Sequence, residues 1–342
     1  MRFAICICIV LFIIGCSGRS EATPFSTVAI EVIHEDSVSI RALERMPGSI
    51  AFAGSDGIFG TVDLADFTVR SKKITHLDSK PEFRAVAHTA TNFFMLSAGD
   101  PALLYKTGDT GEMELVYSES GPDVFYDSMG FWDDLNGIAI GDAMDGCLSI
   151  LITRDGGHSW NKTPCDQLPE ALPGEGAFAA SDTNIAQVGD SCWVVSNKGR
   201  IYFSPDLGEH WKVLQTPVTS STDTFGLYSL DFYDAETGYA AGGDYTDPDG
   251  NTANKISTMD GGTSWVLRAS GQPPGYLSCV QYVPGRGGRD LVGVSYKGIF
   301  YSSDFGASWG TLSSEGFFSL RFADDSTAIA SGNGRIAKLE FK

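Results

Sequence analysis

Thr153-Arg154-Asp155-Gly156-Gly157-His158-Ser159-Trp160 follows the pattern Ser/Thr-x-Asp-x-Gly-x-x-Trp, which occurs four times in this chain. The other copies are Ser204 to Trp211 (SPDLGEHW), Thr258 to Trp265 (TMDGGTSW) and Ser302 to Trp309 (SSDFGASW). A degenerate fifth copy begins at Thr107 and has Glu114 in place of the tryptophan. The five aspartates follow one another at intervals of 46, 51, 54 and 44 residues. A period of about 45 to 50 residues is typical of β-propeller blades, each built from four strands.

Each copy lies between two short β-type runs, so the sequence predicts a hairpin turn at each. Aspartate accepts hydrogen bonds from backbone N–H groups of a turn, glycine adopts positive φ, and tryptophan covers the hairpin with apolar surface. We interpret these residues as structural, locking the turn between the third and fourth strands of a blade; ligand binding or catalysis at the aspartates is the alternative. They are Asp109, Asp155, Trp160, Asp206, Trp211, Asp260, Trp265, Asp304 and Trp309.

A two-strand core precedes each pattern, best seen at Phe131 to Asp142 (FWDDLNGIAIGD) and Leu230 to Asp244 (LDFYDAETGYAAGGD). The fold class that we predict is all-β: a seven-bladed propeller of four-stranded antiparallel blades, with six or eight blades as alternatives. The last blade has three candidate strands, and Thr27 to Ile33 at the N-terminus would supply its outer strand and close the ring. The predicted blades occupy 50–69, 82–117, 124–165, 176–214, 225–268, 276–313 and 317–341.

The repeated unit F-x-D-x-x-x-G-x-A-x-G-D followed by T-x-D-G-G-x-x-W resembles the BNR/Asp-box propellers. Within them it is similar to the photosystem II stability/assembly-factor-like group, which also occurs in non-photosynthetic bacteria. The resemblance covers 27–342 and implies one propeller domain with a sialidase-like fold. It implies little about function, because one fold hosts many activities. The photosynthetic members resemble non-catalytic assembly factors that use a basic patch, a feature that this acidic chain does not share.

The N-terminus predicts export. An apolar run from Phe3 to Ile14 is too short to span a bilayer and fits the core of a signal peptide. Ile13-Ile14-Gly15-Cys16 resembles a bacterial lipobox, which implies a lipoprotein signal at 1–15, lipidation of Cys16 and a tether at 16–26. An ordinary secretory signal is the alternative. We therefore expect a membrane-anchored lipoprotein of the bacterial cell envelope, facing the periplasm or the cell surface, whose only membrane contact is the lipid anchor.

Net charge and cysteine content limit the classes of partner and metal that the sequence supports. The formal net charge of −19 over 342 residues argues against nucleic acid as a partner. Four cysteines lie in the predicted domain, and Cys147 and Cys165 fall almost opposite each other around the turn at Asp155, so they are a candidate disulfide. No cysteine or histidine spacing indicates zinc.

An enzyme is the less favoured interpretation. Sialidases need an arginine cluster, a tyrosine nucleophile and an acid/base aspartate, and begin with Phe/Tyr-Arg-Ile-Pro, which is absent here. The arginines, Arg41 and Arg84 among them, show no repeated placement at strand ends. A glycoside hydrolase or lyase that needs only two carboxylates stays open as the alternative, with a glycan as its ligand and with Tyr126, Trp132 and Tyr245 as candidate stacking residues.

Aspartates that directly follow glycine recur in four blades at the predicted turn between the second and third strands, and Asp56 is a looser equivalent in the first blade. We expect them to form an acidic crescent on the face opposite the Asp-box turns, where a basic segment of a protein partner or a cation would bind. In the alternative interpretation each one caps its own turn. The candidates are Asp56, Asp100, Asp142, Asp190 and Asp244.

The insertion from Asp244 to Asn251 is rich in oxygen ligands. Asp244, Asp247, Asp249 and Asn251 have spacings that suit Ca²⁺, although the bidentate glutamate of an EF-hand is absent. Calcium is the one cofactor that the sequence suggests, and a solvated loop is the alternative. Taken together, the patterns predict a non-catalytic propeller lipoprotein that acts as a protein-binding or assembly scaffold.

Overall fold

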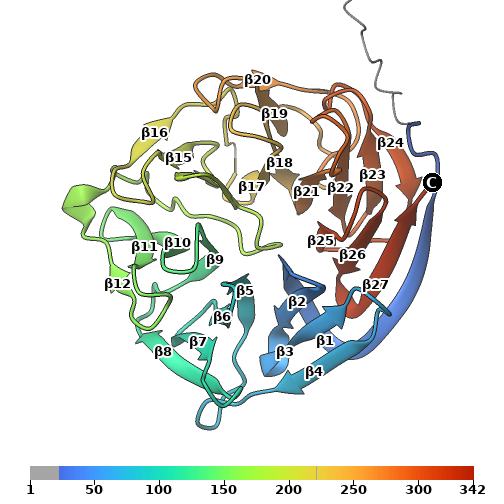
Figure 1. Ribbon diagram of the computed structural model, residues 1–342. Helices are drawn as coiled ribbons and strands as arrows, with labels where there is room; N and C mark the ends of the chain where they lie inside the picture. The colour runs from blue at the N-terminus through green and yellow to red at the C-terminus, as the bar shows by residue number, and fades with distance from the viewer. Residues whose placement is uncertain (1–22, 221) are drawn as a thin grey trace, which may run out of the picture.

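The computed structural model describes residues 23–220 and 222–342, which form a ring of seven antiparallel blades around a central axis (Figure 1). The predicted lipidation site Cys16 and the signal segment lie outside the described residues. Each blade has four strands, with the first strand innermost and the fourth at the rim. Blades 2 and 3 contain β5 (Phe83–His88), β6 (Phe93–Ser97), β7 (Ala102–Thr107), β8 (Met113–Glu119), β9 (Tyr126–Phe131), β10 (Gly137–Met144), β11 (Cys147–Thr153) and β12 (Asn161–Lys162).

Blades 4 to 6 repeat the same order of strands. They contain β13 (Ile185–Val188), β14 (Ser191–Val195), β15 (Ile201–Ser204), β16 (Lys212–Leu214), β17 (Phe225–Phe232), β18 (Gly238–Asp244), β19 (Lys255–Thr258), β20 (Val266–Leu267), β21 (Cys279–Tyr282), β22 (Leu291–Ser295), β23 (Gly298–Ser302) and β24 (Gly310–Ser313).

The N-terminal strand closes the ring, as the sequence predicted. In blade 7, β25 (Ser319–Phe322), β26 (Thr327–Ser331) and β27 (Asn333–Phe341) are followed by the first part of β1 (Val28–Met46), which pairs from Val28 opposite Phe341 to Ser39 opposite Asn333. The same long strand then bends at an irregularity in its pairing and becomes the inner strand of blade 1. Blade 1 continues with β2 (Ser49–Gly54), β3 (Ile58–Asp63) and β4 (Val69–Lys73). Blades 1 and 7 therefore share one continuous seven-stranded sheet.

Blade 1 begins earlier than the predicted 50–69, because Ile40–Met46 is its inner strand. The continuation was not predicted because the stretch His34-Glu35-Asp36-Ser37 is polar and interrupts the apolar pattern of the strand. Among the described residues, seven apolar clusters each lie between two adjacent blades, and a small eighth cluster joins Ala180, Tyr228 and Tyr276. The cluster between blades 2 and 3, for example, contains Phe94, Leu96, Leu104, Met129 and Trp160. Since the ring is closed, every blade packs on two neighbours, and the unpaired strand edges are confined to the outer strands at the rim.

A loop fills the central channel where sequence analysis expected the start of blade 4. Blade 4 begins at Ile185, and residues 177–184, which we call the plug, enter the middle of the ring (Figure 1). The carboxylate of Asp182 accepts hydrogen bonds from the N–H groups of Val86 (2.8 Å) and Met129 (3.3 Å), and its carbonyl oxygen accepts one from Arg321 (2.9 Å). Burial raises the pKa of Asp182 well above its usual value. The plug thus bonds to inner strands of several blades.

Candidate functional site

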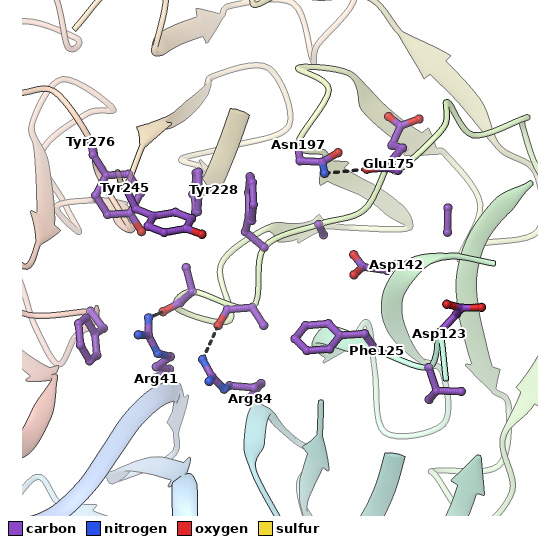
Figure 2. A pocket seen from close by; sticks show the side chains of 18 of the residues that line it. Arg41, Arg84, Asp123, Phe125, Asp142, Glu175, Asn197, Tyr228, Tyr245 and Tyr276 are labelled. Carbon is purple, nitrogen blue, oxygen red and sulfur yellow. Dashed lines mark hydrogen bonds between the residues drawn. The ribbon is translucent and has the colours of Figure 1, made fainter. Parts of the chain in front are cut away.

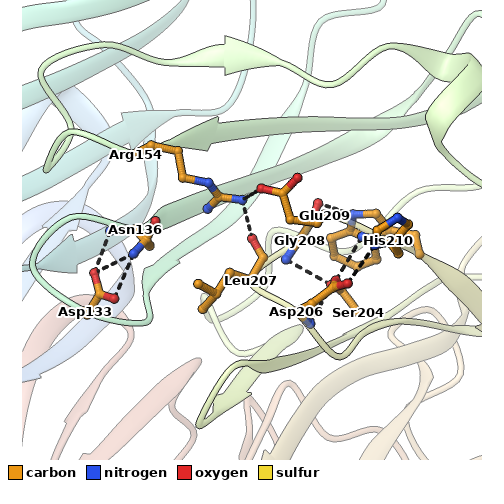
Figure 3. Close-up of polar contacts among 10 residues, drawn as sticks. Asp133, Asn136, Arg154, Ser204, Asp206, Leu207, Gly208, Glu209 and His210 are labelled. Atoms are coloured by element: carbon orange, nitrogen blue, oxygen red, sulfur yellow. Dashed lines mark hydrogen bonds and ion pairs between the residues drawn. The ribbon is translucent and has the colours of Figure 1, made fainter.

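The four Asp-box turns hold themselves together through one repeated set of hydrogen bonds. In the turn at Ser204–Trp211, the Ser204 hydroxyl donates to Asp206 Oδ1 (3.0 Å) and accepts from the Gly208 N–H (2.9 Å) (Figure 3). Asp206 Oδ1 also accepts from the His210 N–H (2.9 Å), and its Oδ2 lies 2.7 Å from His210 Nδ1. Equivalent contacts hold the turns of Asp155, Asp260 and Asp304. These carboxylates are therefore engaged within their own turns.

All four turns lie between the third and fourth strands of blades 3 to 6, on the side that we call the box face. Although burial acts to raise it, the hydrogen bonds from Ser159 and Thr153 lower the pKa of Asp155 to about 2. A Cβ atom on Gly306, which has φ of +73°, would lie 2.1 Å from Tyr239 of blade 5. The turn glycine is therefore also a contact with the preceding blade. Arg154 links two turns by donating to Leu207 O (2.8 Å) and to Glu209 (2.7 Å) (Figure 3).

The degenerate fifth copy lacks this network. Asp109 is exposed in the turn between β7 and β8, and Met113 stands four residues after it, where the intact turns of Asp155, Asp260 and Asp304 have a serine whose hydroxyl donates to the carboxylate. Thr107 instead donates its hydroxyl to Phe93 O (3.2 Å). Met113 has no side-chain donor, whereas the intact turns have serine or, at Asp206, His210 at this position.

The aspartates predicted to form an acidic crescent do not all lie on one face of the propeller. Asp56 and Asp100 lie between the second and third strands of their blades, whereas Asp142 and Asp244 lie near the end of the second strand, β10 and β18 respectively; all four are on the face opposite the box face. Asp190 is not on this face: it lies in the turn between β13 and β14 and its carbonyl accepts the Leu207 N–H (2.8 Å), which places it on the box face. Its placement was wrong because the plug displaces the inner strand, so the Gly-Asp pair joins the first two strands of blade 4.

Three of the remaining aspartates bond to neighbours on the surface. Asp56 lies 3.2 Å from Lys80, and Asp100 accepts the Gly121 N–H (3.2 Å). Asp244 accepts from both the N–H and the hydroxyl of Thr246, at 2.8 and 2.6 Å. Among the predicted aspartates, Asp142 alone lines the cavity that opens on this face.

That cavity, of about 720 Å³, lies at the mouth of the central channel (Figure 2). We call it the pocket, and the side on which it opens the pocket face. The plug forms its floor through Ala177, Phe178, Ala179 and Ala180. A volume of this size suits a small molecule or a few residues of a peptide. Its walls are rich in aromatic side chains, namely Phe125, Phe178, Tyr228, Tyr245, Tyr276, Tyr296 and Phe318.

One wall consists of tyrosines from blades 5 and 6. Phe178 stacks on Tyr228 with ring centroids 3.7 Å apart, and Tyr228 meets Tyr276 edge to face at 4.9 Å. Tyr245 and Tyr296 complete this wall and stay 48% and 43% exposed, and the Tyr296 hydroxyl donates to Tyr245 O (2.8 Å). Exposed tyrosines on a preformed wall offer apolar contact area together with hydroxyl groups for hydrogen bonds.

Two arginines from inner strands lie on the floor of the pocket (Figure 2). Arg41 donates to Ala180 O (3.4 Å) and Arg84 to Ala179 O (3.1 Å). Arg84 also forms an ion pair with Glu82 (2.9 Å). Arg41 lies over the ring of Phe318 at 4.0 Å, and no carboxylate of the described residues pairs with it within 4 Å. Burial lowers the pKa of Arg41, but a guanidinium stays charged in proteins.

The two arginines were not predicted as site residues, although the sequence contains a signal for them. Ile40-Arg41-Ala42 and Phe83-Arg84-Ala85 share an apolar-Arg-Ala pattern 43 residues apart, which is close to the blade period. Both arginines occupy the second position of the inner-strand segment of their blades. The expectation that no arginine has a repeated placement was therefore wrong for this pair.

The opposite wall of the pocket is acidic. Burial raises the pKa of Asp142 to about 6, and the Ala177 N–H acts in the opposite direction. Asp127, on the inner strand β9, has 0% exposure, and burial followed by the nearby charge of Asp142 raises its pKa well above the usual range. Asp123 also lines this wall (Figure 2). Cations and carboxylates therefore face each other across one cavity.

The predicted calcium ligands are not gathered around one point. Asp244 bonds to Thr246 and Thr222, while Asp249 pairs with Lys297 (3.2 Å). Within residues 23–220 and 222–342, no group of three or more histidine, cysteine, aspartate or glutamate side chains is placed to hold a metal ion. The same part of the chain contains no helix that is long and apolar enough to cross a membrane.

The cysteines of the domain divide into a pair and two buried thiols. Cys147 and Cys165 form a disulfide with their Cα atoms 5.5 Å apart. Cys165 lies in a 3-10 turn (Cys165–Gln167) after β12, and not on the fourth strand itself, where the hairpin register would place it. Cys192 and Cys279 are free and buried.

No protein-family model matches this chain, and no curated protein matches it either. Among solved structures, it is similar to one described as YCF48 bound to D1 peptide, with 12% sequence identity, a TM-score of 0.66 and coverage of 94% of this chain and 97% of that chain. It is also similar to U3-55K (12% identity, TM-score 0.62, 91% and 98% covered) and to the RRP9 WD40 repeats (11%, 0.63, 92% and 97%). These likenesses show the fold: the chain is a multi-bladed β-propeller.

Proposed function

We propose that this protein is a non-catalytic, protein-binding scaffold of the cell envelope that engages its partner through the pocket face. The observation that carries the proposal is the pocket itself, which combines exposed tyrosines with an arginine that has no carboxylate partner among the described residues. Polar and charged groups that are partly buried without full compensation are costly to a fold, so their presence at a surface cavity favours a binding role. Asp100 and Asp244 on the pocket face, which we call the acidic rim, add attraction for basic residues of the same partner.

The resemblance of the box turns to BNR/Asp-box propellers and the solved structure of YCF48 with a peptide support the same class of function. A propeller of this architecture holds a peptide in that structure. With 12% sequence identity, the partner itself does not carry over. The proposal for this chain therefore rests on its own pocket, and its partner is defined by the chemistry of that pocket.

We also propose export and lipid anchoring at Cys16. The first described residues lie on the box face: Arg286, between β21 and β22, donates to Thr23 O (2.8 Å). Phe25 is buried against Tyr301 and Phe341, so 23–26 packs on the propeller and does not belong to the tether. An anchor at Cys16 would hold the box face toward the membrane, and the pocket would open away from it.

The test is crosslinked capture of partners from native membranes with full-length protein. The pocket variant carries Tyr245→Ala and Asp142→Asn, and the matched control carries Asp190→Asn, which removes an exposed carboxylate from the opposite face. We expect one protein to be captured by the wild type and by the control and lost in the pocket variant. Capture that survives in the pocket variant would place the binding site elsewhere, and capture of no protein would refute the scaffold.

A carbohydrate-active enzyme is the second candidate. It is favoured by Asp142, whose pKa of about 6 suits a general acid in a pocket with aromatic walls. The other carboxyl with a raised pKa there, Asp127, is fully buried and cannot meet a substrate. Of the proposed stacking residues, only Tyr245 lines the pocket, whereas Tyr126 is buried and donates to Glu119 (2.6 Å). Hydrolysis of chromogenic glycosides by the wild type and its loss in Asp142→Asn would favour this candidate.

A further inference from the structure

The pocket contains a cation that forms no ion pair within the described residues. Arg41 is largely buried; its guanidinium donates to Ala180 O at 3.4 Å, lies over the ring of Phe318, and feels the charge of Glu82 without contacting it within 4 Å. Within the described part of the chain, the Nε atoms of Arg41 and Arg84 are buried without a hydrogen-bond partner. A buried charge without full compensation lowers the stability of the fold. Arginine cannot avoid this loss by releasing its proton, because its pKa lies far above neutral. A bound anion would supply the missing charge.

The geometry favours a carboxylate over other anions. A guanidinium presents its N–H groups as a planar fork that matches the two oxygens of a carboxylate. Arg41 and Arg84 converge on one floor and hold adjacent carbonyls of the plug (Figure 2). Asp123 and Asp142 on the opposite wall, together with the net charge of −19, disfavour a ligand that carries several negative charges.

The remaining walls indicate what the carboxylate is attached to. Tyr276 of the tyrosine wall lines the same cavity as Arg41. The wall offers Tyr245 and Tyr296 as exposed aromatic surface for an apolar side chain. Asp142 lines the facing wall and accepts hydrogen bonds, which suits a backbone N–H group of an extended peptide.

We infer that the pocket binds the free C-terminal end of a polypeptide, with its terminal carboxylate on Arg41 and its last apolar or aromatic side chain on the tyrosine wall. This inference rests on the proposed scaffold function and names the part of the partner that the pocket takes. Basic residues further back along that segment would meet the acidic rim. An acidic sugar is the competing occupant, because it also joins a carboxylate to a surface that stacks on tyrosine.

The experiment compares N-acetyl-L-phenylalanine with its amide by calorimetric titration of the full-length protein. The two probes differ only in the terminal charge. We expect the acid to bind about tenfold more tightly than the amide, the size of one charge-assisted hydrogen-bond pair. Arg41→Gln removes this preference, whereas Arg70→Gln, the same change on the exposed outer strand β4, keeps it. Tyr245→Ala weakens the binding of both probes by a similar factor, so the preference for the acid over the amide is unchanged.

Several results would overturn the inference. Equal affinity of acid and amide, no binding of either, or a preference that survives Arg41→Gln each contradicts a carboxylate on Arg41. Tighter binding of glucuronate than of N-acetyl-L-phenylalanine would assign the pocket to acidic sugars instead. If Arg41→Gln fails to fold, Arg41→Lys replaces it: lysine keeps the charge and loses the fork, so the preference must fall by about threefold or more. An unchanged preference in that variant is also contrary to the inference.

The inference about the chain end and the proposed scaffold function can fail independently of each other. If capture of a partner depends on the pocket but the acid has no advantage over the amide, the scaffold proposal stands and the inference about chain ends is wrong. If the acid is preferred through Arg41 but no partner is captured, the pocket chemistry stands and the scaffold function fails.

Discussion

Replacing Asp142 by asparagine should stabilise the protein, and only at a pH where the aspartate is ionised. The pKa of Asp142 rises from its usual value of 3.8 to about 6, because its carboxylate lies in the pocket with little water around it. Since a tenfold change in an equilibrium constant is worth about 1.4 kcal/mol, ionised Asp142 costs at most about 3 kcal/mol in the folded state. The side chain keeps some contact with solvent, so we expect a penalty of about 1–2 kcal/mol.

The sign follows from proton binding. Below about pH 4 the carboxyl is protonated in both states, and there is no penalty. Between about pH 4 and pH 6 the unfolded chain releases this proton while the folded protein keeps it, so stability falls as the pH rises. Above about pH 6 the penalty is constant. Asparagine is neutral throughout and can still accept the Ala177 N–H through its side-chain carbonyl.

Urea unfolding of both proteins at pH 3 and pH 8 measures the effect. The Asp142→Asn variant should gain about 1–2 kcal/mol at the higher pH and nothing at the lower one. The box aspartates have lowered pKa values and weaken both proteins in acid, but this contribution cancels in the comparison. Asp190→Asn on the box face should change stability by less than about 0.5 kcal/mol at either pH. An equal gain at both pH values, or a loss at pH 8, would show that the reasoning is wrong.

Three further outcomes test the fold and the metal question. Gly306→Ala should lower the free energy of unfolding by about 2–4 kcal/mol, because Gly306 has positive φ and an added Cβ atom would clash with Tyr239. Gly310→Ala has open space around the added atom and should be nearly neutral. Thermal unfolding measures both variants. Removing the disulfide by Cys147→Ala and Cys165→Ala should cost about 3 kcal/mol, the loop entropy expected for a separation of 18 residues, and a reductant should then have no effect on the variant. Millimolar calcium should leave the melting temperature unchanged, since the loop carboxylates have separate partners; a clear rise would restore the calcium hypothesis.

The loss of folding stability that we expect from ionised Asp142 is itself an argument for a functional role of this residue. Proteins keep destabilising groups mostly where activity needs them, since most sites can change without loss of function. Asp142 makes no ion pair among the described residues and bonds to the plug through one N–H group. Arg41 on the floor of the pocket is likewise a largely buried charge with no ion pair among the described residues. The two residues that weaken the fold therefore line the same cavity, which favours a binding role for it.

The sequence determined the fold because the relevant signals are local and repeated. A box turn is defined by contacts within five residues, from Thr153 to Gly157 or from Asp155 to Ser159, so its pattern is visible without knowing the rest of the chain. Its spacing gave the blade length, and the two-strand core repeated ahead of the turns gave the count of seven blades, with six or eight as alternatives. The closing strand at Thr27 to Ile33 could be predicted because blade 7 lacked a strand and a closed ring needs one.

The tertiary structure alone decided where the functional groups lie. Asp190 and Asp142 both follow glycine, yet the plug shifts the strands of blade 4 and moves Asp190 to the box face. The pocket joins Arg41, Tyr276 and Asp142 from three different blades, separated by more than a hundred residues of sequence. Turn chemistry acts between neighbours along the chain, whereas a cavity at the ring centre depends on the closure of all seven blades and on the loop that fills their channel. For this reason the sequence determined the architecture, and the closed ring determined the site.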